Sequence, residues 1–274
     1  MKKSWVAYPY LVWMILFMLI PLLLIVFFGI TERSGDGIIF TLENFKRFFE
    51  PIYIMVLLRS LYLALISTIV CLIIGYPLSM ILAGRDYRHK RVLILLLVIP
   101  MWMNFLLRTY AWLTLLEKNG VINSIITFLG LPKADLLYNQ GAVVLGMVYN
   151  FLPFMILPIY SVLIKIDKSV IEAAEDLGAN SRTIFRKIIF PLSLPGVVSG
   201  ITMVYMPAVT TFIISRLLGG GQFTLIGNLI EQQFLHTGDW GFGSALSIVM
   251  MLLILFSMAI MSKYEKEHEG GGLF

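Results

Sequence analysis

Long apolar stretches, separated by short polar segments, make up most of this 274-residue chain. A helix needs about 20 mainly apolar residues to cross a bilayer. Six stretches reach that length, and they cover residues 8–30, 54–83, 92–115, 142–164, 196–218 and 242–261. They lack the strict alternation of barrel strands, and lipid offers no partner to a free backbone group. The pattern therefore predicts an all-α membrane protein with six transmembrane helices.

The remaining segments predict one membrane domain over residues 1–262 and no separate soluble domain. In two outer loops, residues 40–51 and 121–131 carry apolar positions at helical spacing, which predicts short surface helices. The tail, residues 263–274, is charged and then glycine-rich, and we expect it to lack fixed structure.

Composition and charge support this class and predict an orientation. Apolar residues make up 59% of the chain and charged residues 14%, whereas soluble domains average about half and about a quarter. With the N-terminus inside, the expected inner segments 1–7, 84–91, 165–195 and 263–274 hold 13 of the 21 Lys and Arg residues. Because basic residues accumulate on the cytoplasmic side, both termini are predicted to be cytoplasmic. The net charge of +5 is then a topology signal, and we expect no nucleic acid partner.

The inner segment 165–195 is too long and too patterned to be a simple connection between two spans. A capping box at Ser169 and Glu172 predicts the start of a short helix, and Gly178 suits its left-handed end. A second amphipathic helix follows, which Pro191 is expected to end or kink. The segment therefore predicts two short helices joined by a glycine turn.

Periodicity alone leaves two interpretations of this loop open. Ala173 and Ala174 give the first helix a narrow surface that another protein backbone can approach closely. The second helix starts at either Asn180 or Ser181. The loop is therefore either a docking knob for another protein or an amphipathic hairpin on the membrane surface.

The same loop resembles a known family at fixed spacing. Glu172-Ala173-Ala174, Gly178 four residues later and the ending Ile188-x-Phe190-Pro191 resemble the EAA loop of ABC importer permeases, which usually ends in Ile-x-Leu-Pro. The resemblance implies a type I ABC importer permease fold, whose loop carries the coupling helix that docks on a separate ATPase. It assigns the docking surface to Glu172, Ala173, Ala174, Leu177 and Gly178. Glu172 keeps a second interpretation, as part of the capping box.

The resemblance also implies a complex of several subunits in the plasma membrane of a bacterium. The expected partners are a second, C-type permease, an ATPase dimer, an extracytoplasmic substrate-binding protein and membrane lipid. The chain has no Gly-x-x-x-x-Gly-Lys-Ser/Thr loop, so we expect no cofactor on it and place ATP and magnesium on the partner ATPase. His89, His236 and His268 are scattered, which favours a non-catalytic subunit over an enzyme.

Further segments narrow the substrate. Pro100–Trp112, Leu217–Gly221, Leu225–Asn228, Gln233–Leu235 and Asp239–Gly243 resemble spermidine/putrescine permeases, the B type more than its C-type sister. The resemblance therefore implies polyamine import. Two alternatives stay open: a type I permease for another small solute such as iron, thiamine or phosphonate, and a secondary transporter or channel that works alone.

A polycation requires acidic groups or aromatic faces along its path, because a cation–π contact contributes about 0.5–2 kcal/mol. The residues expected to line this path are Trp102, Asn104, Tyr110, Tyr149 and Tyr205. The alternative for such rings is the aromatic belt at a membrane interface, which we favour for Trp112. Glu231 and Asp239 lie in outer loops, where they are expected to meet substrate or binding protein.

Charges and prolines inside the stretches complete these expectations. Arg108 and Arg216 lie near the outer ends of their stretches, so we expect both side chains to extend toward the outer interface. Pro153 and Pro158 make the fourth stretch the candidate for a bent, moving helix.

Overall fold

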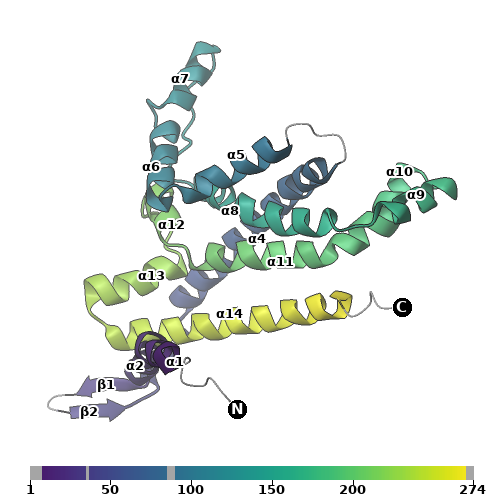
Figure 1. Ribbon diagram of the computed structural model, residues 1–274. Helices are drawn as coiled ribbons and strands as arrows, with labels where there is room; N and C mark the ends of the chain where they lie inside the picture. Colours follow the sequence, from purple (N-terminus) through teal and green to yellow (C-terminus); the bar gives the residue numbers. More distant parts are fainter. Residues whose placement is uncertain (1–7, 35–36, 85–89, 270–274) are drawn as a thin grey trace, which may run out of the picture.

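The computed structural model describes residues 8–34, 37–84 and 90–269, and most of them lie in helices (Figure 1). In chain order the elements are α1 (Tyr8–Met14), the π-helical turn η2 (Ile15–Leu19), α2 (Ile20–Gly29), β1 (Thr31–Ser34), β2 (Gly37–Phe40), α3 (Glu43–Phe48), α4 (Pro51–Ala83), α5 (Lys90–Trp102), α6 (Phe105–Leu116), α7 (Val121–Phe128), α8 (Gln140–Leu163), α9 (Lys168–Asp176), α10 (Ser181–Ile184), η3 (Phe185–Ile189), α11 (Phe190–Thr210), α12 (Ile213–Leu218), α13 (Ile226–Gln232), η4 (Gln233–Thr237) and α14 (Trp240–Glu269).

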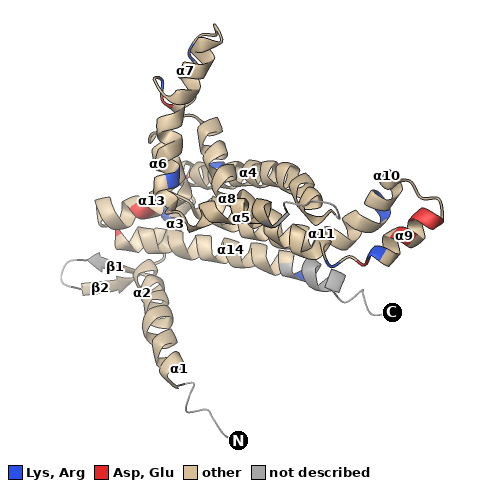
Figure 2. Ribbon diagram, turned by 45° about the horizontal axis from the view of Figure 1, so that its top comes forward, with Lys and Arg blue, Asp and Glu red and all other residues tan. Residues whose placement is uncertain are grey.

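The long helices form one bundle with two distinct ends (Figure 1). At one end, called the loop end, lie α9, α10 and the C-terminal part of α14. At the other, called the hairpin end, lie α13 and the antiparallel pair β1–β2. Figure 2 shows that charged residues gather toward the ends and are sparse along the bundle. This distribution is typical of a bundle that crosses a bilayer.

Among the described residues, five helical segments are long and apolar enough to span a membrane: Tyr8–Gly29, Pro51–Ala83, Gln140–Leu163, Ser181–Thr210 and Trp240–Met261. A sixth is present when the pair Val92–Trp102 and Phe105–Phe128, bent by 97° at its break, is counted as one broken span. With this broken span counted, the prediction of an all-α protein with six spans is confirmed. The direction in which the chain crosses the membrane stays a prediction.

The centre of the bundle is the mutual packing of α4, α8 and α11. Gly196 and Gly200, one turn apart on α11, face α8. A Cβ on Gly196 would lie 2.9 Å from the carbonyl oxygen of Pro158, and one on Gly200 would lie 2.9 Å from the sulfur of Met155. Small residues at this spacing let two membrane helices approach closely, because dispersion contacts replace the hydrophobic drive that lipid does not supply.

The first span stands apart from this centre. α2 packs on α14, where a Cβ on Gly29 would lie 2.8 Å from the side chain of Ile248. In the most apolar window of Tyr8–Gly29, 0% of the residues are buried. Figure 2 shows α1 projecting away from the bundle. Most of this apolar helix is therefore left for contact with lipid or another subunit.

At the loop end, Pro191 does not end a helix, so of the two outcomes expected for this proline only the kink stays a prediction. Ser181–Thr210 is one continuous helical segment of 30 residues, and Pro191 lies at the start of α11, directly after η3. A proline lacks the N–H that an α-helix would bond four residues back. The π-helical turn changes the hydrogen-bond spacing just before Pro191, and the segment continues. The inner loop is thus shorter than the expected 165–195.

Two of the expected spans are interrupted, and the last helix extends further into the C-terminal tail than expected. The third stretch breaks between α5 and α6, and the fifth breaks between α11 and α12. By contrast, α8 runs through Pro153 and Pro158 without interruption, so the breaks lie outside the helix for which the prolines predicted a bend.

α14 continues to Glu269, which corrects the expectation for most of 263–274; residues 270–274 lie outside the described residues. The two predicted surface helices are confirmed as α3 and α7.

One close contact at the hairpin end yields a stability prediction. Gly146 on α8 is covered by α12, where an added Cβ would overlap Leu218 and lie 2.9 Å from Ile214. We expect Gly146→Val to destabilise the protein by about 1–3 kcal/mol, because the packed helices must move apart. Thermal unfolding of the purified protein in detergent measures this. Gly37→Val is the matched control, since nothing lies within 4 Å of that Cβ position. An equal unfolding temperature for both variants would contradict the packing.

Candidate functional site

The first helix of the loop end, α9, begins two residues earlier than the capping box predicts. Its N-cap is Asp167, whose Oδ1 accepts a hydrogen bond of 3.0 Å from the backbone N–H of Ser169. This bond from the backbone of Ser169 lowers the pKa of Asp167, because it stabilises the carboxylate. Ser169 therefore lies inside the helix, and the capping interpretation of Glu172 is wrong.

The end of α9 is a Schellman motif, as the glycine predicts. Gly178 has φ +80°, and its N–H bonds the carbonyl of Glu175 at 2.8 Å, while Ala179 N–H bonds the carbonyl of Ala174 at 3.0 Å. The next helix is capped by Asn180, whose side chain accepts from Thr183 N–H at 2.9 Å. The two helices are thus joined by a defined turn in which most backbone groups are paired, so the knob is preorganised.

The expected docking residues lie on the outside of this knob. No residue of α9 is buried within the chain, and the side chain of Leu177 is 88% exposed. Ala173 and Glu172 are exposed, and Ala174 is half-buried. An apolar side chain this exposed beside two alanines is typical of a contact surface for another protein. The assignment of these residues to ATPase docking stays a prediction.

Because the third span is broken, two candidate path residues lie at the break and not inside a continuous helix. Trp102 ends α5 and is 80% exposed, so it does not lie in the middle of a continuous helix. Asn104 caps α6: its Oδ1 accepts from the backbone N–H groups of Leu106 at 2.8 Å and Leu107 at 3.4 Å. The Oδ1 of Asn104 therefore accepts from backbone N–H groups at the start of α6 that have no helical carbonyl as a partner.

Arg108, one turn into α6, is buried rather than extended toward an interface. Only 7% of the residue is exposed, and its guanidinium carbon lies 5.9 Å from the centre of the Phe105 ring. Its Nε has no hydrogen-bond partner among the described residues. The expectation that this arginine extends toward the outer interface is wrong, because its side chain is buried within the chain.

Among the aromatic path candidates, the structure brings Tyr149 into contact with a ring that the sequence placed in the interfacial belt. The rings of Tyr149 on α8 and Trp112 on α6 lie 5.3 Å apart, edge to face. Tyr110 is 46% exposed, and Tyr205 packs against the core from α11. Within the described part of the chain, no ring contact joins these two to the Trp112–Tyr149 pair. The path assignments stay predictions.

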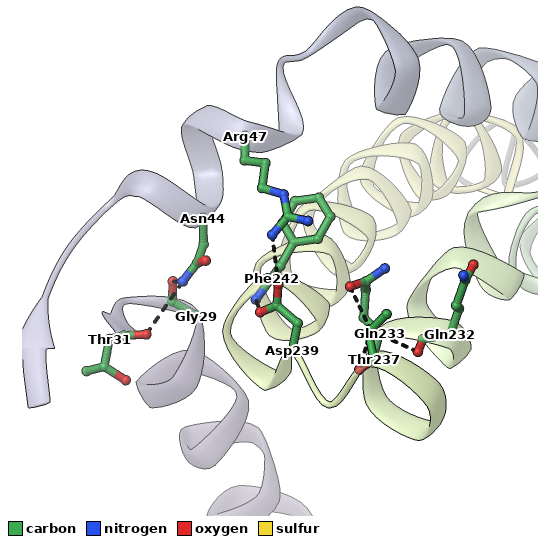
Figure 3. A network of polar contacts seen from close by, with 9 residues as sticks. All are labelled: Gly29, Thr31, Asn44, Arg47, Gln232, Gln233, Thr237, Asp239 and Phe242. Carbon is green, nitrogen blue, oxygen red and sulfur yellow. Dashed lines mark hydrogen bonds and ion pairs between the residues drawn. The ribbon is translucent and has the colours of Figure 1, made fainter. Parts of the chain in front are cut away.

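Both outer acids are engaged by arginines of the same chain. Asp239 accepts a bond of 2.7 Å from Arg47 on α3, and the same guanidinium lies 4.1 Å from the centre of the Phe242 ring (Figure 3). The other oxygen of Asp239 accepts from Phe242 N–H at 3.0 Å and so caps α14. Glu231 on α13 pairs with Arg216 on α12 at 2.8 Å. Sequence reasoning missed Arg47, whose partner lies 192 positions away.

Comparisons with known proteins agree on one family. The model of the family "binding-protein-dependent transport system inner membrane component" matches residues 1–267. The spermidine/putrescine transport system permease protein PotB of Escherichia coli strain K12 is 40% identical over 247 residues, which cover 88% of this chain and 90% of that protein. The protein of the same name from Haemophilus influenzae is 39% identical over 252 residues, which cover 89% of this chain and 88% of that protein. A bacterial ABC transporter involved in the import of the acidic polysaccharide alginate contains a chain of similar fold, with a TM-score of 0.80, 15% identity and 96% of each chain covered.

The Arg47–Asp239 pair yields a prediction about the hairpin end. Asp239→Asn keeps an acceptor for Phe242 N–H and loses the ion pair, so we expect a loss of up to about 1 kcal/mol, since both side chains are partly exposed, 41% and 34%. The thermal unfolding temperature should fall by a few degrees and lose part of its dependence on salt. Asp135→Asn, whose pair with Lys118 spans 3.8 Å at 73% and 89% exposure, is the control and should change nothing. An equal change of unfolding temperature in Asp239→Asn and Asp135→Asn would contradict a stabilising role for the Arg47–Asp239 pair.

Proposed function

The chain belongs to the family of binding-protein-dependent transport system inner membrane components, and from this we propose that it is a permease subunit of an ATP-driven polyamine importer. The observation that carries the proposal is the exposed, preorganised knob at the loop end, with Leu177 88% exposed beside the turn at Gly178. A knob of this kind suits a groove in a separate ATPase, which binds ATP and magnesium.

The preference for polyamines rests on the relatives. PotB of Escherichia coli is a spermidine/putrescine transport system permease by name, and it is 40% identical to this chain along nearly its whole length. Similarity is spread along the chain and is not confined to the coupling loop. This supports a shared substrate class more strongly than the EAA loop alone, which permeases for other solutes also carry.

One continuous helical segment offers a mechanical path from the ATPase to the hairpin end. Ser181–Thr210 begins two residues after the turn that ends α9 and reaches the break before α12. At about 1.5 Å per residue this segment is about 45 Å long, more than the thickness of the bilayer core. Closure of the ATPase subunits would move α9 and, through this segment, the break at the far end. A second permease would complete the path, and a binding protein would deliver substrate at the hairpin end.

The groups of this chain that are available to bind a cation are mainly aromatic rings. Glu231 and Asp239 already hold Arg216 and Arg47, so neither carboxylate is free for an ammonium group in this conformation. The Trp112–Tyr149 pair presents ring faces at the junction of α6 and α8, where cation–π contact is available. We infer that the second permease supplies further substrate contacts.

The docking proposal predicts an uncoupled variant. At Gly178, φ is +80° and nothing lies within 4 Å of an added Cβ, so Gly178→Val acts by straining the turn and not by local crowding. We expect uptake and substrate-stimulated ATP hydrolysis by the reconstituted complex to fall at least ten-fold, with the two permeases still assembled.

The chain contains a matched control for this variant. Gly130, at the end of α7, has φ +79° and also has nothing within 4 Å of an added Cβ. Gly130→Val makes the same change far from α9, and it should leave coupling intact. Full uptake and full stimulated hydrolysis in Gly178→Val would refute ATPase docking at this loop.

Substrate class is tested by uptake into proteoliposomes that contain the whole complex and its binding protein. We expect ATP-dependent accumulation of labelled spermidine, with competition by unlabelled putrescine and none by thiamine or phosphonate. Competition by thiamine or phosphonate alone would favour the permease for another solute. Accumulation that persists without the ATPase would favour a transporter or channel that works alone, and it would overturn the proposal.

A further inference from the structure

The fifth span is interrupted at Thr211 and Phe212, between α11 and α12. Thr211 adopts an extended conformation, with φ −64° and ψ 135°. Neither residue is a proline or a glycine, so the two positions themselves do not forbid a continuous helix. The interruption is therefore maintained by contacts from elsewhere in the fold.

One of those contacts comes from the side chain of Asn228 on α13. It reaches the carbonyl of Phe212, which also accepts from Arg216 N–H at 3.0 Å within α12. The Nδ2 of Asn228 donates to this carbonyl oxygen at 2.8 Å. Its Oδ1 accepts from Leu225 N–H at 3.3 Å and from the hydroxyl of Ser215 on α12. One amide thus joins the break, the helix after the break and the start of its own helix.

The start of α13 packs directly against the C-terminal end of α11 at the break. A Cβ on Gly227 would overlap the carbonyl oxygen of Thr210, so only a glycine allows this approach. The N–H of Ile226 donates to the hydroxyl of Ser60 on α4 at 2.8 Å, and both residues are fully buried. α4 therefore holds α13 in the position from which Asn228 reaches Phe212.

We propose that Asn228 is the clamp that keeps the hairpin end of the fifth span in its broken form, and that the transport cycle releases this clamp. The inference rests on the proposed function, because it needs a cycle driven by a partner ATPase. The long helical segment Ser181–Thr210 ends directly at the break, so a displacement begun at α9 is applied to the Asn228–Phe212 contact. A few directional hydrogen bonds at a helix interruption make a two-state element, since they are either formed or lost. Asn228 is in this sense a positioning residue for α12.

Variants of Asn228 separate the parts of the clamp. Asn228→Asp keeps the acceptor for Leu225 N–H and the Ser215 hydroxyl, and it loses the donor to the Phe212 carbonyl. Ser215→Ala removes only the hydroxyl and serves as a second, milder variant if the first does not assemble. Asn123→Asp is the matched control, because the Asn123 amide also donates to backbone carbonyls, those of Glu117 and Ala134, but far from the break.

The readout is the reactivity of a single cysteine at the break. The chain has one native cysteine, Cys71, which is buried, so Thr211→Cys can be labelled selectively with a maleimide. The complete complex in nanodiscs is labelled at rest and after trapping with magnesium, ATP and vanadate. We expect the labelling rate at Thr211→Cys to change at least five-fold on trapping. Asn228→Asp should move the resting rate at least halfway toward the trapped rate, and Ser215→Ala should move it less in the same direction.

The control and the contrary results are distinct. Asn123→Asp should leave the resting rate unchanged and so show that the effect belongs to the break. Equal rates at rest and after trapping, in a complex that hydrolyses ATP, would overturn the clamp alone. An unchanged resting rate in a well-assembled Asn228→Asp complex would also overturn it. A wild-type complex that does not hydrolyse ATP would overturn the proposed function, and the clamp with it.

Discussion

The arrangement of this protein depends on one constraint: a helix that is interrupted near lipid must find partners for its freed backbone groups within the protein. Asparagine side chains supply these partners at both interrupted spans. Asn104 accepts from two N–H groups at the start of α6, and Asn228 donates to the Phe212 carbonyl at the fifth-span break. An unpaired backbone group in hydrocarbon costs several kcal/mol. Asn104 pairs N–H groups that have no helical partner, and Asn228 adds a bond to a carbonyl that also accepts from Arg216 N–H, so both side chains stabilise the broken form.

The same constraint divides the molecule into a rigid centre and adjustable ends. α8 and α11 approach so closely at Gly196 and Gly200 that they can be expected to move together. At the loop end, the Asp167 cap and the Schellman turn at Gly178 pair most of the backbone of the knob internally, so its outer face is free to contact another protein. At the hairpin end, individual polar contacts add to close packing at Gly146 and Gly227. The continuous segment Ser181–Thr210 joins the two, which gives a physical route for coupling.

Sequence reasoning succeeded where the determinants are local. The six apolar stretches and the glycine turn at Gly178 follow from residues within a few positions of each other. So does the start of the second loop helix, which the sequence left between Asn180 and Ser181 and for which the structure shows Asn180 as the cap. Sequence reasoning took Ser169 as the helix cap because Ser169 has a glutamate three residues later, and it did not consider Asp167 two positions before. The fifth-span break was missed because its partner is distant, whereas the cap of the third-span break, Asn104, is local and was interpreted as a path residue. Thr211 and Phe212 carry no helix breaker, and Asn228 lies 16 positions from Phe212. Pairing of Asp239 with Arg47, 192 positions away, has no local signal at all.

The central claim is that this chain works only as one subunit of an ATPase-driven complex. The most direct test is to purify the tagged chain from the membranes of the organism that expresses it, in mild detergent, and to identify its companions by mass spectrometry. The account predicts a complex of this chain with a second permease and two copies of an ATPase, which hydrolyses ATP. A chain that is recovered without an ATPase and still transports solute in proteoliposomes would contradict the account.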